Sequence, residues 1–195
     1  MIRQPVLVTD RLLLRPFTLA DAPEVQRLAG NHEVASRTLA IPYPYRDGVA
    51  EAWIATHQPG FERGTHLVYA VTHRWKRDLL GAAGLVEVNR RHERAELGFW
   101  VGRPYWGRGY ATEAVRAVIE YGFSVLGLHR IAATHLSRNL ASGRVMEKCG
   151  MVHEAHLREH ARKGGVFEDV DVRGILHDEW RQQCVEPAIR ECRIR

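Results

Sequence analysis

The sequence predicts an α/β fold of the α+β kind, a mixed and mostly antiparallel sheet of six to seven strands with helices on both faces. Three observations support this. Helical patterns dominate the chain before His66, three β-prone segments then follow one another through short connections, and a glycine-rich turn later opens a long helix.

The first part of the chain is mainly helical. Arg11–Arg15 is a short β-prone run, and Thr18–Asp21 places a capping residue three positions before an acid, which predicts a helix through Leu28. Asp47 is expected to cap a second helix at 49–57. The loops between these helices are expected to line a substrate site.

Three consecutive strands are expected at 67–72, 79–89 and 94–101. Their connections are short enough for hairpins, so they should form an antiparallel meander.

A strand–helix–strand crossover should follow the meander. Pro104 ends the third strand, and Gly107 and Gly109 allow a turn that residues with a Cβ resist. Apolar residues then recur at helical spacing up to Leu126, and the strand 130–135 comes next. A crossover of this kind makes the strands 94–101 and 130–135 parallel neighbours.

The remaining elements are a helix at 140–148, stopped by Gly150, and two strands at 152–158 and 166–176 joined by a turn at 163–165. We expect one domain, residues 8–180, and a basic C-terminal tail, residues 181–195.

Composition is that of an ordinary globular protein, with 45% hydrophobic and 26% charged residues. No apolar run is long enough for a membrane span or a signal peptide, so we expect a cytoplasmic protein without a membrane partner. Three cysteines without C-x-x-C spacing argue against a disulfide framework or a cysteine zinc site. The net charge of +5 is compatible with an anionic partner, but its scattered cations do not favour nucleic acid.

The turn and the helix after it form a candidate anion site, because the first N–H groups of a helix lack intrahelical partners and carry the positive end of its dipole. A Walker A loop is excluded, since no lysine or magnesium-binding hydroxyl is in place. A dinucleotide fingerprint fits poorly, because Thr112 occupies its third glycine position. A glycine-rich connection without a ligand stays open on this segment alone.

The residues of this segment resemble the acetyl-CoA loop of the GNAT acetyltransferases: a glutamine or arginine, two residues of any kind, a glycine, one further residue, and a glycine or alanine. Gly109 and Ala111 match, whereas Trp106 departs from the first position. Further segments extend the resemblance over Val8 to Trp180, and more narrowly to the RimJ/RimL type: Thr9–Arg15, Ala95–Trp100, Tyr105–Glu113, Asn139–Ser142, Met146–Gly150 and Glu168–Asp169. Many GNAT enzymes have a general-acid tyrosine where Met146 stands, and the RimJ/RimL branch shares this departure.

The resemblance implies a GNAT fold whose parallel strand pair splays apart at the acetyl-CoA site. Backbone groups of Phe99, Trp100 and Val101 would bind the pantetheine amides, and Asn139 would contact the pantetheine arm. The diphosphate would lie on the turn and first helical residues, which are Trp106, Gly107, Arg108, Gly109, Tyr110, Ala111 and Thr112. Glu113 would repel a diphosphate, so we expect it to turn toward a partner of its own.

Acetyl transfer from a thioester to an amine needs a base, an oxyanion donor and a stabilised thiolate, and no metal. Glu96 is the first candidate for the base, the alternative being a carboxylate that positions the amine or pairs with an arginine such as Arg94. His135 is the rival base. Ser142 is the candidate thiolate stabiliser or proton donor, as in the RimL-type enzymes, unless it only serves the helix terminus; it would also contact the cofactor.

The histidines 153, 156 and 160 do not predict a metal site, because strand alternation points 153 away from the other two. The sequence therefore predicts an acetyl-CoA-dependent N-acetyltransferase that acts on a protein N-terminus, such as that of a ribosomal protein, or on a small amine, as a monomer or homodimer. The alternative is a non-catalytic GNAT-like module that senses acyl-CoA or binds nucleic acid through Arg190–Arg195.

Overall fold

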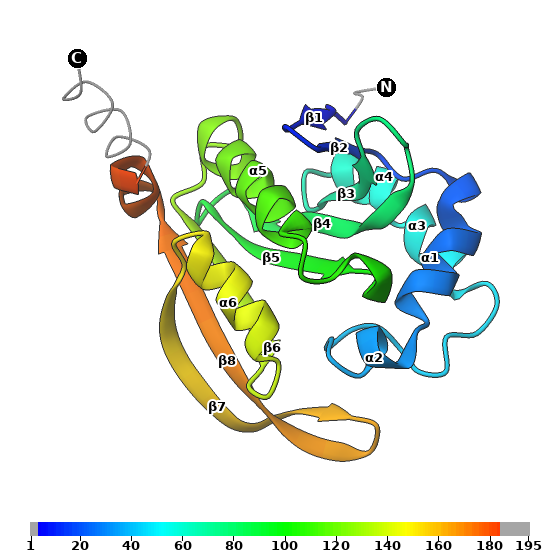
Figure 1. Ribbon diagram of the computed structural model, residues 1–195. Coiled ribbons are helices and arrows are strands. Elements are labelled where there is room, and N and C mark those ends of the chain that lie inside the picture. The colour runs from blue at the N-terminus through cyan, green and yellow to red at the C-terminus, as the bar shows by residue number, and fades with distance from the viewer. Residues whose placement is uncertain (1–3, 184–195) are drawn as a thin grey trace.

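The computed structural model describes residues 4–183 and contains an eight-stranded sheet in the order β1-β2-β3-β4-β5-β6-β8-β7 (Figure 1). Neighbouring strands are antiparallel except β5 and β6, which are parallel. The strands are β1 (Leu7–Val8), β2 (Leu12–Arg15), β3 (Leu67–His73), β4 (Leu79–Asn89), β5 (Arg94–Val101), β6 (Arg130–Leu136), β7 (Val152–Lys163) and β8 (Val166–Leu176).

The helices come mainly before the meander and around β6. The α-helices are α1 (Ala22–Ala29), α2 (His32–Ala35), α3 (Val49–Ala55), α4 (His57–Glu62), α5 (Tyr110–Ser124) and α6 (Leu140–Lys148), and the short 3-10 helices are η1 (Leu19–Asp21) and η2 (Arg103–Tyr105). Residues 177–183 are helical as well. The basic end of the predicted tail, Arg190–Arg195, lies outside the described residues.

The predicted meander and crossover are confirmed, with β4, β5, α6 and β8 at the expected residues. The sheet has eight strands rather than the predicted six to seven. The strand that was missed is β1, whose two residues pair with Leu13 and Leu14 but are too few to show an alternating pattern. The single helix at 49–57 was wrong, because α3 ends at Ala55 and α4 follows. Asp47 does not cap α3: Gly48, with φ 83°, takes that position, and Asp47 accepts a hydrogen bond from Gln26 Nε2 at 2.7 Å.

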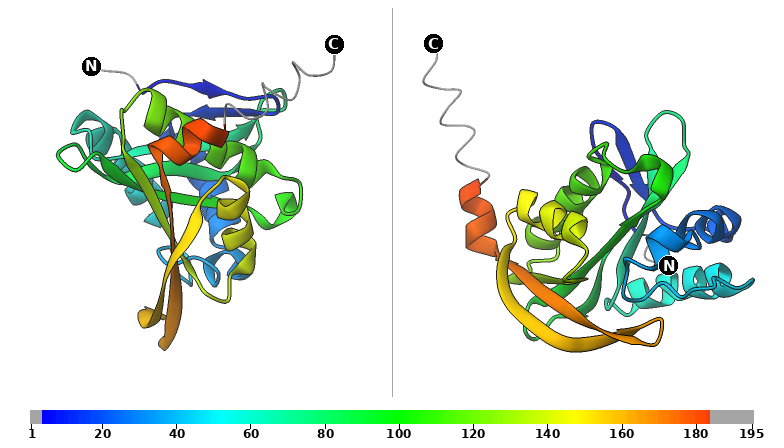
Figure 2. Two further views of the ribbon diagram at one scale, coloured as in Figure 1. Left: turned by 90° about the vertical axis from the view of Figure 1, so that its left-hand side faces the viewer. Right: turned by 60° about the horizontal axis from the view of Figure 1, so that its bottom comes forward.

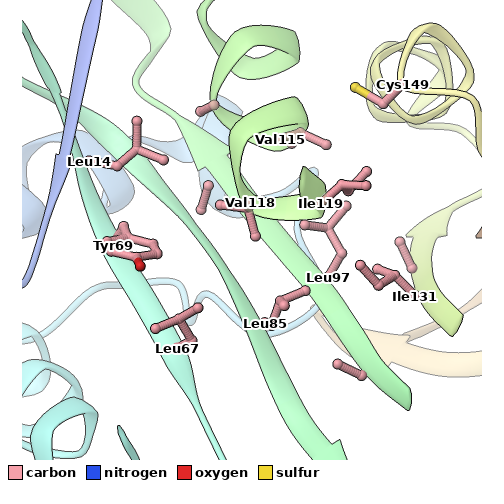
Figure 3. Packing of buried hydrophobic residues seen from close by; sticks show 14 of the residues in the cluster. Leu14, Leu67, Tyr69, Leu85, Leu97, Val115, Val118, Ile119, Ile131 and Cys149 are labelled. Carbon is pink, nitrogen blue, oxygen red and sulfur yellow. The ribbon is translucent and has the colours of Figure 1, made fainter. Parts of the chain in front are cut away.

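The sheet is covered on both faces, as predicted. On one face α5 packs its apolar side onto the central strands, and Figure 3 shows Val115, Val118 and Ile119 of this helix against Leu85 and Leu97 of the strands. On the other face α1 and α3 bury a second, smaller cluster of side chains. Burial of these apolar side chains contributes about 1.5–3 kcal/mol each and fixes which sheet face each helix covers.

The two parallel strands separate soon after they meet. β5 and β6 pair only at Arg94–Arg130, Ala95–Ile131 and Glu96–Ala132. Beyond Glu96, β5 continues to Val101 along β4 alone, so one of its edges is open. The predicted splayed pair is therefore present, and the gap between the strands opens beside the glycine turn.

The β7–β8 hairpin is longer than predicted and curves away from the sheet (Figure 2). Two bulges, between His153 and Ala155 and between Leu157 and Ala161, bend β7. At the tip, the Lys163 ammonium donates to the Ile41 carbonyl, so the hairpin reaches the segment that follows α2. This contact helps to enclose the space beside the open edge of β5.

Candidate active site

The open edge of β5 presents main-chain groups to the gap. Gly102 N–H donates to Leu80 O at 2.8 Å, so by antiparallel alternation Trp100 faces β4 with its backbone, while Phe99 and Val101 face the gap. Trp106 Nε1 donates to Val101 O at 2.6 Å. Hence the Phe99 main chain and the Val101 N–H are available to pair with a strand-like ligand. The Trp100 main chain is turned to β4, and this residue lines the gap with its side chain instead.

The glycine turn delivers the N-terminus of α5 to the same gap. Gly107 and Gly109 have φ of 74° and 78°, conformations that favour glycine, and a Cβ at Gly107 would meet no atom within 4 Å. The first N–H groups of α5, at Tyr110, Ala111 and Thr112, find no partner within residues 4–183. Main-chain donors and the helix dipole thus converge on open space, which suits a diphosphate.

Glu113 turns away from this space, as predicted. Its carboxylate accepts hydrogen bonds from Thr9 Oγ1 at 2.6 Å, Arg11 N at 2.9 Å and Arg11 Nε at 2.7 Å. Burial acts to raise the pKa of Glu113, but these hydrogen bonds outweigh it and hold the pKa below its usual range. Arg11 Nη1 also donates to Arg108 O at 3.0 Å, so the N-terminal segment fixes both α5 and the turn.

A cavity of about 340 Å³, here called the basic hollow, lies between this turn and α6. It is lined by the predicted residues Trp106, Gly107, Gly109, Tyr110, Ala111 and Thr112, while Arg108 is not part of its lining. Three cations that the sequence did not single out, Arg37, Arg144 and Lys148, also line it, and among residues 4–183 no carboxylate does. Scattered in the sequence, these cations meet beside the free N–H groups of α5.

A second cavity of about 460 Å³, here called the apolar hollow, lies on the α1 and α3 side of the open β5 edge. Most of its walls are aliphatic or aromatic, and Glu96 is the carboxylate of its lining. The two cavities share six lining residues: Arg37, Thr38, Phe99, Trp100, Asn139 and Ser142. The two hollows therefore adjoin one another along these residues, one reaching the helix N-terminus and the other reaching Glu96.

Asn139 and Ser142 stand at this junction. Asn139 caps α6 and is buried; its Nδ2 donates to Ser142 Oγ and to Arg37 O, both at 2.8 Å. Because Ser142 Oγ accepts from Asn139, its hydroxyl hydrogen is free to point elsewhere. Ser142 thus has both a helix-terminal role and a donor that can face the junction.

Glu96 and His135 differ in availability. Glu96 is partly exposed, and its Oε1 accepts from Thr134 Oγ1 at 2.9 Å rather than from Arg94. His135 also lines the apolar hollow, but its ring is buried, with Nδ1 2.9 Å from Leu136 O and with Nε2 buried and without a hydrogen-bond partner among residues 4–183. The geometry therefore favours Glu96 as the group that meets an acceptor.

The histidines of β7 do not behave as strand alternation predicted. The bulge between His153 and Ala155 brings His153 and His156 to the same carboxylate, Asp171, at 3.5 Å and 2.7 Å. The hydrogen bond to Asp171 raises the pKa of His156. In the part of the chain that the structure describes, no group of three or more histidine, cysteine or acidic side chains could hold a metal ion. Nor is any helix there long and apolar enough to cross a membrane.

Fold and site together define an acyltransferase architecture, with a splayed parallel strand pair, a free helix N-terminus, and a carboxylate in an adjoining hollow. A family model described as acetyltransferase (GNAT) domain matches residues 11–152. This chain belongs to the GNAT acetyltransferases and is an N-acetyltransferase of that family.

Two curated relatives cover most of the chain. The uncharacterized N-acetyltransferase YoaA of Bacillus subtilis is 32% identical over 88% of this chain and 97% of its own length. The spermidine N(1)-acetyltransferase of Vibrio cholerae is 26% identical over 89% of this chain and 97% of its own length. Among solved structures, a GNAT-family acetyltransferase from Bacillus anthracis superimposes with a TM-score of 0.78 at 26% identity, covering 89% and 99% of the two chains.

GNAT acetyltransferases use acetyl-CoA. The residues present fit that molecule: N–H groups at Tyr110, Ala111 and Thr112 that have no partner in the described part of the chain, a strand edge at Phe99 and Val101, and cations for phosphates.

Proposed function

We propose that this protein transfers the acetyl group of acetyl-CoA directly to a primary amine. The observation that carries the proposal is the junction of the two hollows, where a basic hollow beside a helix N-terminus adjoins a space with a single lining carboxylate among the described residues. Direct transfer requires both reactants in one continuous cavity, and orientation of this kind lowers the barrier by several kcal/mol.

Acetyl-CoA supplies an activated acetyl group as a thioester. In this proposal the N–H groups at the start of α5 hold its diphosphate, with Arg144 and Lys148 alongside. The free edge of β5 at Phe99 and Val101 orients the pantetheine arm as an added strand. Arg37, which lines both hollows, lies 4.9 Å over the Trp106 ring.

Glu96 is the proposed general base. It lines the apolar hollow, and its Oε1 is oriented by Thr134, which leaves the other carboxylate oxygen for a proton of the ammonium or of a bridging water. The alternative, a carboxylate that only positions the amine, predicts an altered KM with an unchanged pH profile in the Glu96→Gln enzyme.

Ser142 is the proposed donor to the leaving thiolate. Asn139 fixes the Ser142 oxygen from one side, so the hydroxyl hydrogen can point into the junction. A Ser142→Ala enzyme should retain acetyl-CoA binding and lose kcat. An unaltered kcat would remove Ser142 from the chemistry.

The acceptor is either a protein N-terminus, as a RimJ/RimL-type role on a ribosomal protein would require, or a small amine, the class that the Vibrio cholerae relative's name indicates for that enzyme. Thiol release from acetyl-CoA over peptides beginning with Ala, Ser or Met, aminoglycosides and other amines would test turnover. Acetyl-CoA binding by calorimetry is the companion test. Absence of binding at millimolar acetyl-CoA would refute the proposal.

A further inference from the structure

We propose that the acceptor carries one positive charge on an apolar body, and that Gly98 provides the room for that body. This inference rests on the proposed function, since it describes the amine that enters the apolar hollow. It is carried by the charges, the walls and the floor of that hollow.

The lining charges allow for one ammonium group. Glu96 is the carboxylate of the lining, whereas Arg37 adds a cation at the junction. On β8, Glu168 is paired with Arg138. Glu51 on α3 is exposed and outside the lining, although burial and its charge raise the pKa of the lining residue Tyr45. A second ammonium in this hollow would lose water without gaining a carboxylate, which is costly.

The walls are apolar over most of their extent. α1 contributes Val25, α3 contributes Val49 and Trp53, and the segment after α2 contributes Ile41 and Tyr45. A cavity of about 460 Å³ lies within the usual range for small-molecule sites, which are lined mainly by apolar side chains.

The segment after α2 is held in place over the hollow by contacts from the other side of the gap. Arg138 Nη2 donates to Ser36 O at 2.7 Å, and Asn139 Nδ2 donates to Arg37 O. Lys163 donates to Ile41 O from the hairpin tip. These three contacts anchor the segment after α2, and with it part of the apolar wall, in the described structure.

The floor of the hollow is open at Gly98. This residue lies on β5 between Glu96 and Trp100, and all three share one face of the strand. A Cβ built at Gly98 would meet no heavy atom within 4 Å, and its backbone has no positive φ. A Cβ is thus sterically allowed here, and a longer side chain built on it would extend into the space beside the proposed base.

The first test compares pentylamine with cadaverine, which has the same carbon chain and a second ammonium. Thiol release should give pentylamine a kcat/KM about tenfold or more above that of cadaverine, after correction for the two equivalent amines of cadaverine, because the second charge finds no partner. Phenylethylamine should also be accepted, and spermidine should not. A higher kcat/KM for cadaverine, spermidine or an aminoglycoside would overturn the inference while leaving the proposed function intact, as would turnover of peptides alone.

The second test is the Gly98→Leu variant, with Val125→Leu as a matched control at an exposed position that lines neither hollow. Gly98→Leu should bind acetyl-CoA like the wild type, which also reports a folded protein, and lose about tenfold in kcat/KM for pentylamine. Calorimetry with pentylamine in the presence of CoA measures the acceptor site independently of turnover. Pentylamine binding that Gly98→Leu abolishes, without thiol release from any amine, would support the acceptor site and refute the proposed function. Equal binding and turnover in Gly98→Leu and the wild type would refute the role of Gly98.

Discussion

Replacement of Glu113 should loosen the anchor that holds the start of α5 against the N-terminal segment. The Glu113 side chain is 18% exposed, and its carboxylate is paired with Arg11, whose side chain is 43% exposed. The Glu113→Ala change removes the hydrogen bonds from Thr9 Oγ1, Arg11 N and Arg11 Nε together. The Glu113→Gln change keeps an acceptor oxygen but removes the charge.

The magnitude follows from these contacts. A hydrogen bond to a charged group contributes about 1.5–3 kcal/mol, and an exposed ion pair adds less than about 1 kcal/mol. Because Arg11 is partly hydrated, it recovers water when Glu113 is lost, whereas the Arg11 N–H and the Thr9 hydroxyl lose an acceptor. We expect Glu113→Ala to lower the free energy of unfolding by about 2–4 kcal/mol, and Glu113→Gln by about 1–2 kcal/mol.

Urea denaturation at neutral pH measures both values, and a double-mutant cycle with Arg11→Ala isolates the pair. The folded-state pKa of Glu113 is lowered, so its contribution should be present above the unfolded pKa and lost as pH falls through the folded pKa. Glu113→Gln should lack this acid-dependent loss. A Glu113→Ala protein within about 0.5 kcal/mol of the wild type would refute the reasoning.

Three further predictions concern the base, the phosphates and a buried histidine. Glu96→Gln should lower kcat and remove the acidic limb of the pH–rate profile, and an unchanged profile would exclude Glu96 as base. Lys148→Ala should weaken acetyl-CoA binding about fivefold and reduce the salt dependence of that binding. Calorimetry at two salt concentrations measures both effects. Lys76→Ala is the control, because Lys76 lines neither hollow. His57 is buried beside Trp53, and burial, with the charge of His66, lowers its pKa to about 4. Its protonation therefore favours unfolding, and stability should fall by up to about 3 kcal/mol as pH drops from about 6.5 to 4. A histidine titration followed by NMR with a midpoint near 6.5 would contradict this.

The order of the elements could be predicted because each carries a local signal. Strand alternation, the capping pair Thr18 and Asp21, and the glycines of the turn are visible within a few residues of sequence. The sequence predicted that Glu113 turns toward a partner of its own, but the identity of that partner as Arg11 depends on a contact over a hundred positions away.

What the sequence could not provide depends on tertiary structure. A bulge inserts one residue without a compositional signal, so the convergence of His153 and His156 on Asp171 was missed. The gathering of Arg37, Arg144 and Lys148 in one hollow requires α6 and the segment after α2 to meet. The short helix α2 (His32–Ala35) was not predicted, because its four residues are too few to show an amphipathic period.

The most direct test of the account is the response of individual backbone amides to acetyl-CoA, followed by NMR on the labelled protein. We expect the largest chemical-shift changes at Gly107 to Thr112, followed by Phe99 and Val101, because these N–H groups face the gap without partners in the described structure. Saturable binding that shifts other amides and leaves these unchanged would contradict the claim that the start of α5 and the edge of β5 hold the cofactor.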